Sequence, residues 1–269
     1  MPSTPPSPLN VSALGGSMWR WGSSWWGVLY FGLVALVTAL SPSTYNRANR
    51  LAMARLMVAT TWRVLPWFTL LSALISLVLI RIVVVTAQSY GLSQYALDVV
   101  VRVLVLELIP LSAALFVVLR GAMAAEADLS SLPVGSDAPG RHAQTVLVRT
   151  ELLPRVVAAV FSVVTLAAVS SVVALVLAYV NVYGFTPWGF AAYTRMVGRV
   201  FDPATGIGFV LKIALFSIAV AVVPVASALQ ARLWTAHSDR SGRKAPSGTV
   251  RLFLVLVLIE GASLALKYI

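Results

Sequence analysis

The sequence predicts an all-α integral membrane protein, in which five transmembrane helices follow an interfacial or shallowly inserted N-terminal helix. Hydrophobic residues make up 59% of the 269-residue chain and charged residues only 11%, whereas soluble domains carry roughly 25% charged residues. Five apolar segments are each near or above the length that crosses a hydrocarbon core. None has the charged face that a helix of a soluble bundle would show. Ordinary globular enzymes, disordered regulators and coiled coils are therefore excluded.

The N-terminal region divides into a tail and a longer segment at 18–63. Residues 1–17 are uncharged and rich in Pro and Ser, which predicts a flexible tail. The apolar run Trp25–Leu40 resembles a signal peptide, but the stretch before it has too few basic residues for that role. Because tryptophan favours the membrane interface and the run is short for a span, we expect a retained interfacial helix followed by a basic elbow. Whether Trp25–Leu40 spans the membrane stays open.

The five spans are expected at 65–87, 97–120, 153–180, 207–232 and 250–268, within one domain at 64–269. The basic residues of the loops orient these spans. The loops 41–64, 121–152 and 233–249 are rich in basic residues, the loop 88–96 has no charge, and the loop 181–206 has two arginines. Since cytoplasmic loops carry the excess of Lys and Arg, we expect the three basic loops in the cytoplasm and the C-terminus outside.

Several kinds of chemistry are absent from the sequence. The chain has no cysteine, which excludes disulfides, thiolate metal sites and cysteine nucleophiles. Its two histidines, His142 and His237, lie far apart in polar loops, so we expect no zinc site. No Walker A, GxSxG or HExxH motif occurs, so any energy must come from a partner or an ion gradient. The net charge of +11 lies mostly between apolar runs, which indicates membrane topology and not a nucleic-acid partner.

Five of the ionisable residues within the predicted spans are candidates for function, because a charge at membrane depth is costly. Arg81 and Arg102 lie toward span ends, where snorkelling to the interface explains them equally well. Glu107 lies about ten residues into the second span, close to Pro110. Because proline removes a backbone hydrogen bond, a carboxylate beside a proline kink indicates a function or an ion pair between helices. The other two are Lys212, for which snorkelling is again an alternative, and Glu260, for which a structural bridge is an equal alternative.

Short motifs in order along the chain resemble one family of permeases. The second span has E-L-I-P at 107–110, A-A-L at 113–115, L-R-G at 119–121 and A-A-E at 124–126. Further along the chain are P-R-V-V-A at 154–158, Asp202 followed by G-I at 206–207, Lys212 with Phe216, and Glu260. The first span ends in A-Q at 87–88. From about Trp62 to the C-terminus, this pattern resembles the MlaE (YrbE-like) permeases of ABC transporters that work with MCE-domain proteins on lipids.

The chain also departs from the family pattern in ways that indicate a divergent branch. Leu106 and Ile109 stand where the family has arginine and glycine, and Ala127-Asp128-Leu129 replaces the family's L-G-T-M.

The resemblance implies a homodimeric or heterodimeric permease in a bacterial inner (cytoplasmic) membrane, with a periplasmic C-terminus. Two ATPase subunits would dock on the loop 121–152, where a short coupling helix at about 120–132 would present Arg120, Glu126 and Asp128. An MCE-domain protein would lie on the periplasmic side, and a phospholipid or related lipid would occupy a cavity at the dimer interface. No cofactor is expected on this chain, because ATP and Mg would bind the ATPase. The candidate residues for the lipid cavity and the intramembrane charges are Arg81, Gln88, Glu107, Pro110, Lys212 and Glu260.

Within this frame we expect Lys212 to pair with Glu260, since the family has a lysine and an acid at these positions. Glu107 would then face a water-filled or headgroup-filled cavity and change partners as the cavity opens. Two other functions stay open: a membrane scaffold without transport, and an intramembrane lipid-modifying enzyme with Glu107 or Glu260 as acid or base. The enzyme is disfavoured because no histidine or cysteine lies at membrane depth. Transport direction, lipid class and the identity of the dimer partner are not determined by the sequence.

The predicted orientation can be tested by labelling, because the cysteine-free chain gives no background. A cysteine at Ser93, in the uncharged 88–96 loop, should react in intact cells with a membrane-impermeant thiol reagent. A cysteine at Ser241, in a basic loop, should react only after the membrane is permeabilised. Labelling of Ser241→Cys in intact cells would reverse the orientation.

Overall fold

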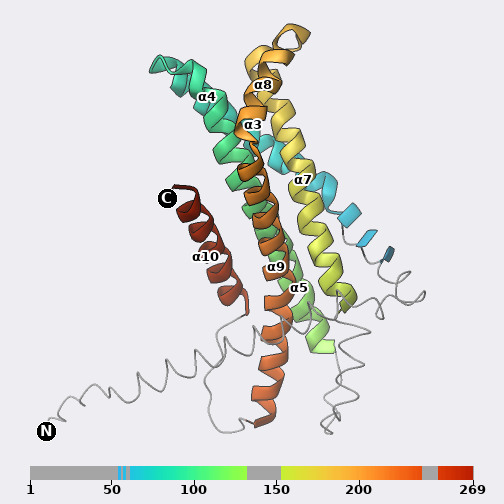
Figure 1. Ribbon diagram of the computed structural model, residues 1–269. Helices are drawn as coiled ribbons and strands as arrows, with labels where there is room; N and C mark the ends of the chain where they lie inside the picture. Colours follow the sequence, from blue (N-terminus) through green and yellow to red (C-terminus); the bar gives the residue numbers. More distant parts are fainter. Residues whose placement is uncertain (1–53, 56, 59–60, 132–152, 238–247, 269) are drawn as a thin grey trace, which may run out of the picture.

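The structure is a computed structural model that describes residues 54–55, 57–58, 61–131, 153–237 and 248–268. All the secondary-structure elements in these ranges are helices (Figure 1), which confirms the predicted all-α class. The predicted tail at 1–17, the Trp25–Leu40 helix and most of the elbow lie outside the described residues. So do residues 132–152 of the basic loop 121–152 and residues 238–247 of the basic loop 233–249.

Within the described residues, five helices are long and apolar enough to cross a membrane, as predicted. Judged by length and composition, the spans are Leu65–Ser89, Ser93–Gly121, Pro154–Tyr183, Pro203–Pro224 and Gly248–Lys267. The first is α3 (Leu65–Ser89), and the second is built from α4 (Ser93–Val100), η2 (Val101–Leu108) and α5 (Ile109–Ser131). The last three lie in α7 (Leu153–Tyr183), α9 (Pro203–His237) and α10 (Gly248–Tyr268). Exposed leucines and valines along α3 suit a surface that faces lipid tails.

The second span does not break at Pro110 but widens in front of it. Its middle section, η2, is a π-helix, in which the Ile109 N–H donates to the Leu104 carbonyl. Proline cannot donate a backbone hydrogen bond, and its ring crowds the preceding turn. The wider turns of η2 end at Leu108, two residues before the buried Pro110, and the helix continues as α5. Such π-helical segments occur often at functional sites, and this one carries Glu107.

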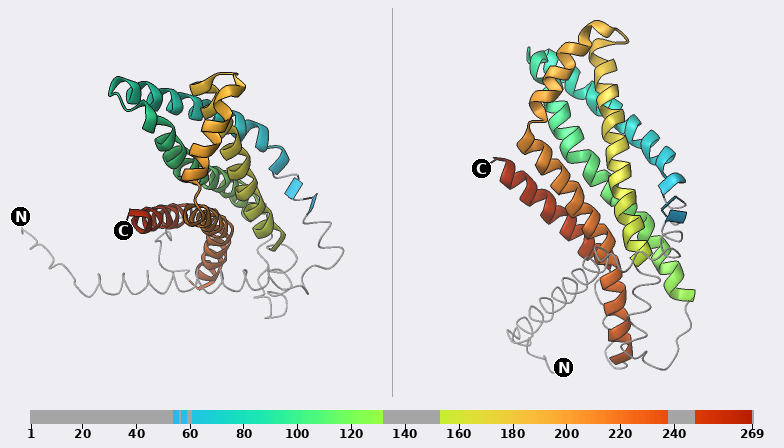
Figure 2. Two further views of the ribbon diagram at one scale, coloured as in Figure 1. Left: turned by 45° about the horizontal axis from the view of Figure 1, so that its top comes forward. Right: turned by 45° about the vertical axis from the view of Figure 1, so that its right-hand side comes forward.

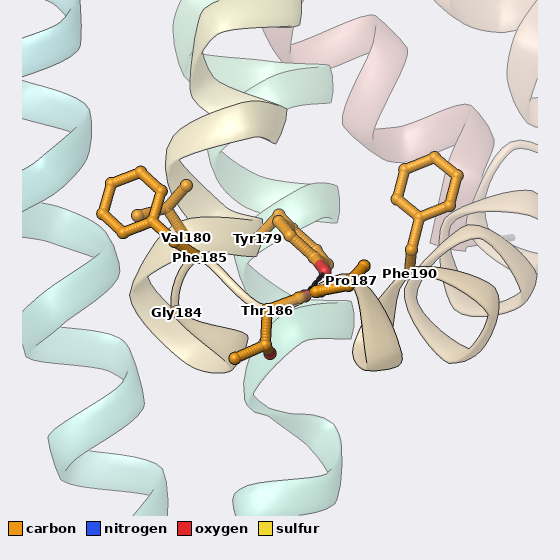
Figure 3. Close-up of a pocket in the computed structure, with 7 residues that line it drawn as sticks. All are labelled: Tyr179, Val180, Gly184, Phe185, Thr186, Pro187 and Phe190. Atoms are coloured by element: carbon orange, nitrogen blue, oxygen red, sulfur yellow. Dashed lines mark hydrogen bonds between the residues drawn. The ribbon is translucent and has the colours of Figure 1, made fainter.

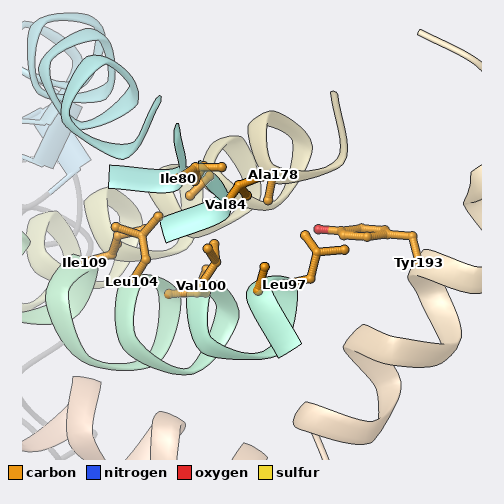
Figure 4. Packing of buried hydrophobic residues seen from close by; sticks show 11 residues of the cluster. Ile80, Val84, Leu97, Val100, Leu104, Ile109, Ala178 and Tyr193 are labelled. Atoms are coloured by element: carbon orange, nitrogen blue, oxygen red, sulfur yellow. The ribbon is translucent and has the colours of Figure 1, made fainter. Parts of the chain in front are cut away.

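The core lies where α5, α7 and α9 pack against one another. α3 packs mainly on α7, and α10 packs mainly on α9. One cluster of fully buried side chains, which includes Val163, Phe216, Leu252 and Leu256, joins α7, α9 and α10. A second cluster joins α3, the second span and α7 through Ile80, Val84, Val100 and Ile109, with Tyr193 at its edge (Figure 4).

α9 and α10 differ in their extent along the bundle. α9 begins with Asp202 as its N-cap, whose Oδ1 accepts a 2.9 Å hydrogen bond from the Thr205 N–H. Hydrogen bonds from the Thr205 side chain and backbone hold the pKa of Asp202 below its usual value. α9 contains Pro224 and changes direction along its length (Figure 2), as expected for a proline inside a helix. α10 lies beside α9 and ends near the level at which α9 begins, below the tips of α4 and α8 (Figures 1 and 2).

A short amphipathic helix closes the end of the bundle at which α3, α4 and α7 meet. η4 (Pro187–Gly189) leads into α8 (Phe190–Val200), which buries Tyr193 and Val200. The Tyr193 hydroxyl donates a 2.7 Å hydrogen bond to the Leu175 carbonyl, and burial beside Tyr183 raises its pKa to about 12. A Cβ at Gly189 would lie 2.4 Å from Tyr183 Cδ1, so this close approach requires glycine.

Candidate intramembrane charge site

Four ionisable side chains from three membrane spans meet inside the apolar bundle. Glu107 is supplied by η2, Lys212 by α9, and Glu260 and Lys267 by α10. We call this group the charge cluster. It contains two carboxylates and two ammonium groups, so its formal charge is zero when all four are ionised.

The charge cluster is a chain of alternating charges. The Lys212 ammonium lies between the two acids: it donates to Glu107 Oε2, and its Nζ is 2.8 Å from Glu260 Oε2. The Lys267 Nζ donates a 3.0 Å hydrogen bond to Glu107 Oε1. Each oxygen of Glu107 therefore has its own lysine. The contact with Glu260 is an ion pair that lacks aligned hydrogen-bond geometry.

Burial differs sharply between the two lysines. The side chain of Lys212 is 3% exposed and that of Lys267 is 24% exposed, while Glu107 and Glu260 are 14% and 16% exposed. The Lys212 ammonium also lies 5.8 Å from the ring centroid of the fully buried Phe216, a favourable cation–π distance. An unpaired charge at this depth would cost several kcal/mol. Two carboxylates and an aromatic ring together stabilise the buried Lys212 ammonium.

Local helix geometry explains how each side chain reaches the cluster. Lys212 and Phe216 are four residues apart on α9 and so lie on one face. Glu260 and Lys267 are seven residues, or about two turns, apart on α10. α9 and α10 pack along one another, which directs these two faces toward Glu107. The arrangement keeps acidic and basic side chains in alternating order. It also gives Glu107 two lysine partners and Lys212 two acidic partners.

The comparisons with known proteins assign the chain to a family. The family model described as Permease MlaE matches residues 53–266, which is most of the chain. The chain belongs to the MlaE permease family. Neither the comparison with curated proteins nor the comparison with solved structures gave a match. Family membership and the five apolar helices of the described residues make the chain a multi-pass membrane permease.

Of the site residues predicted from the sequence of this MlaE-family permease, Glu107, Lys212 and Glu260 come together in the charge cluster. The other predicted residues lie elsewhere. Arg81 and Gln88 are on α3, where Arg81 is exposed, and Arg120 is exposed on α5. Pro110 is buried next to the π-helix. Arg102 forms a 2.9 Å ion pair with Asp98, one turn earlier on the same span, with both side chains partly exposed.

The predicted coupling segment continues the second span. α5 remains helical to Ser131, so Arg120, Glu126 and Asp128 lie in its last turns and not in a separate short helix. The side chains of Glu126 and Asp128 lie outside the described part of the structure. Their contact with an ATPase stays a prediction.

The structure corrects the expected role of Glu107. The expected contact between Lys212 and Glu260 is present, but Glu107 is not the acid left without a lysine, because both Lys212 and Lys267 donate to it. Sequence reasoning missed Lys267, because a lone basic residue at the end of a span is ordinary in membrane helices. Two signals indicate it: two buried acids with one lysine leave a charge of −1, and Lys267 lies on the same helical face as Glu260.

The α7–α8 connection also forms an open pocket of about 420 Å3, away from the charge cluster (Figure 3). Its lining residues are Tyr179, Val180, Gly184, Phe185, Thr186, Pro187 and Phe190, of which none is charged. Within the described ranges, no group of three or more histidine, aspartate or glutamate side chains is arranged to hold a metal ion.

The charge balance of the cluster gives a stability prediction. Lys212→Met alone leaves a net charge of −1, and Glu260→Leu alone leaves +1, whereas the double variant keeps only the neutral Glu107–Lys267 pair. Breaking a buried pair typically costs about 3–5 kcal/mol, but replacing both partners with apolar residues is often near neutral. Each single variant should therefore lower the yield of monodisperse protein and its thermal midpoint in detergent, and the double variant should recover both.

As the control, Asp98→Asn with Arg102→Met removes a partly exposed pair and should change stability by less than about 1 kcal/mol. If the Lys212/Glu260 double variant is no more stable than the less stable single variant, Lys212 and Glu260 do not stabilise each other.

Proposed function

We propose that this permease is the membrane subunit of an ATP-driven ABC transporter that moves phospholipid or a related lipid between the inner membrane and an MCE-domain partner. The family match over residues 53–266 carries the proposal. The chain lacks a nucleotide-binding motif of its own, so the proposal places ATP hydrolysis on a separate ATPase chain.

The distribution of burial supports a second permease subunit. In the α10 span only 11% of the residues are buried within the chain, compared with 50% in the second span. α10 packs on α9 and α5 and leaves its outer face exposed. In the proposal this face lines a cavity shared with a second permease copy or a paralogue. Lipid tails need no hydrogen bonds, so leucine, valine and phenylalanine suffice to line such a cavity.

The charge cluster gives the proposed cycle a switchable element. Interactions in an apolar interior are strong, and a packed arrangement of alternating charges favours discrete states over gradual deformation. Glu107 accepts from two lysines on two different spans, so a change of partner at this one carboxylate would alter how α9 and α10 are joined to η2. We propose that this exchange accompanies opening of the lipid cavity.

The proposal is tested by purifying the tagged permease from its native membrane and reconstituting the complex into vesicles. An ATPase chain and an MCE-domain protein should co-purify in fixed stoichiometry, and lipid transfer should require ATP. Glu107→Gln leaves the charge cluster at +1, as Glu260→Leu does, but the glutamine carbonyl still accepts a lysine hydrogen bond, so the yield should fall less than in Glu260→Leu and transfer is compared per amount of folded protein. The variant should slow lipid transfer at least about tenfold, the effect of losing one charged hydrogen bond.

Leu108→Ala, an exposed change at the next position of η2, serves as the control and should leave transfer near the wild-type rate. A stable chain without an associated ATPase would favour the scaffold function, and lipid turnover by the isolated chain would favour the enzyme.

The last turns of α5 give a separate prediction about coupling. If Glu126, with the neighbouring Arg120, anchors the ATPase, Glu126→Lys should reverse a contact charge and reduce either complex assembly or lipid-stimulated ATP hydrolysis, by several-fold. Glu126→Gln should have a smaller effect because it removes the charge without reversing it. Assembly and hydrolysis that are unchanged in Glu126→Lys would leave Glu126 as a solvated helix charge.

A further inference from the structure

The two halves of α10 are attached to the bundle in different ways. In its first half, Leu252 and Leu256 are fully buried in the core cluster shared with Phe216. Beyond Leu256, none of the described residues of α10 is buried, and Leu266 is 80% exposed. The second half instead makes ionic contacts, Glu260 with Lys212 and Lys267 with Glu107. Ion pairs therefore take the place of a core at this end of α10.

A weak point in the helix separates the two contacts. Gly261 follows Glu260 directly, and a Cβ at this position would meet nothing within 4 Å, so no close packing explains the glycine. Glycine inside a helix costs roughly 1 kcal/mol relative to alanine. Ala262 and Ser263, which follow it, are also small. The segment 261–267 is thus a helical arm whose far end is tied down by Lys267.

The Lys267 contact is the exchangeable one of the two lysine contacts to Glu107. Lys212 is 3% exposed and contacts both acids, whereas Lys267 is 24% exposed and, among the described residues, forms its ion pair with Glu107 alone. If Lys267 leaves, Glu107 keeps its bond to Lys212 and is not stranded. The remaining three groups then carry −1, and the freed ammonium carries +1. Departure of Lys267 therefore needs a new anion for Lys267 but no new partner for Glu107.

We propose that Lys267 is a latch that holds the arm 261–267 of α10 on Glu107, and that an anionic phosphate oxygen of a bound lipid headgroup releases it by replacing Glu107. A lysine ammonium has three donors and binds phosphate as a point charge. The latch lies next to the exposed outer face of α10, where a lipid has access to it. The inference rests on the proposed function for the identity of the ligand as a lipid. The latch itself follows from the ion pairs.

Hydrogen exchange of the full chain in nanodiscs tests the latch. Three conditions at equal ionic strength are compared: phosphatidylglycerol discs, discs of an uncharged galactolipid without phosphate, and the galactolipid discs with added inorganic phosphate. Amides of residues 262–267 should exchange at least about tenfold faster in phosphatidylglycerol than in galactolipid, the change expected when one charged hydrogen bond is lost. Amides near Leu252 and Leu256 should not differ.

Variants separate the latch from a general effect of charge. Lys267→Met should exchange fast at residues 262–267 in all three conditions, because the contact to Glu107 is gone. Lys267→Arg should keep slow exchange in galactolipid and the response to phosphatidylglycerol. Arg199→Met, which removes an exposed cation from α8, should behave as wild type. Size-exclusion profiles establish that each variant is folded.

The outcomes are distinguishable from those of the proposed function. Faster hydrogen exchange of the arm with inorganic phosphate as well as with phosphatidylglycerol would support replacement of Glu107 by phosphate as the partner of Lys267. It would also show that any free phosphate group can serve as the ligand. Equal exchange in all three conditions, or slow exchange of Lys267→Met in galactolipid, would overturn the latch. ATP-driven lipid transfer is measured on the same preparations. Transfer without a latch response would refute only this inference, whereas a latch response without transfer would refute only the proposed function.

Discussion

Charge neutrality inside an apolar bundle is the constraint on which this structure depends. Two carboxylates and two ammonium groups lie in alternating order between η2, α9 and α10, and most of their surface is withdrawn from solvent. The free energy of an isolated charge in such a place is high, so each member is tolerable only because the others are present. The positions of three spans relative to one another are therefore tied to a single electrostatic balance.

The helices around the charge cluster are adapted to this balance in different ways. The π-helix η2 ends where Pro110 would otherwise disrupt the backbone, and it supplies the carboxylate with two lysine partners. α9 supplies the most buried lysine and backs it with the ring of Phe216. α10 uses apolar packing for its first half and ion pairs for its second. The half of α10 without buried side chains is thus held by ionic contacts in place of apolar packing, and regions with few buried apolar contacts open most readily.

A bundle with ionic contacts inside and mostly apolar faces outside suits a membrane subunit that works in an assembly. Apart from the exposed Arg81 and Gln88 on α3, the exposed faces of α3 and α10 are mostly apolar, so they can contact lipid or a second permease subunit at little polar cost. The second span extends as α5 to Ser131, beyond the predicted hydrocarbon-spanning segment. In the proposed transporter, a displacement of this extension would be transmitted along one continuous helix to Glu107. Helices are rigid enough for such transmission, provided that the two ends have discrete alternative contacts.

The sequence alone determined the all-α class, the five spans and three members of the charge cluster. Span length depends on a local run of apolar residues, and a charge within such a run is conspicuous wherever it lies, so Glu107, Lys212 and Glu260 needed no coordinates to be found. The same local logic did not reveal the π-helical turns of η2 that precede Pro110. Only the tertiary structure decided the partners. Lys267 and Glu107 are 160 residues apart in sequence, and they meet because α10 packs along α9 and ends where η2 presents its carboxylate. Partner choice depends on the relative height and rotation of three helices, and no local pattern of residues encodes these quantities.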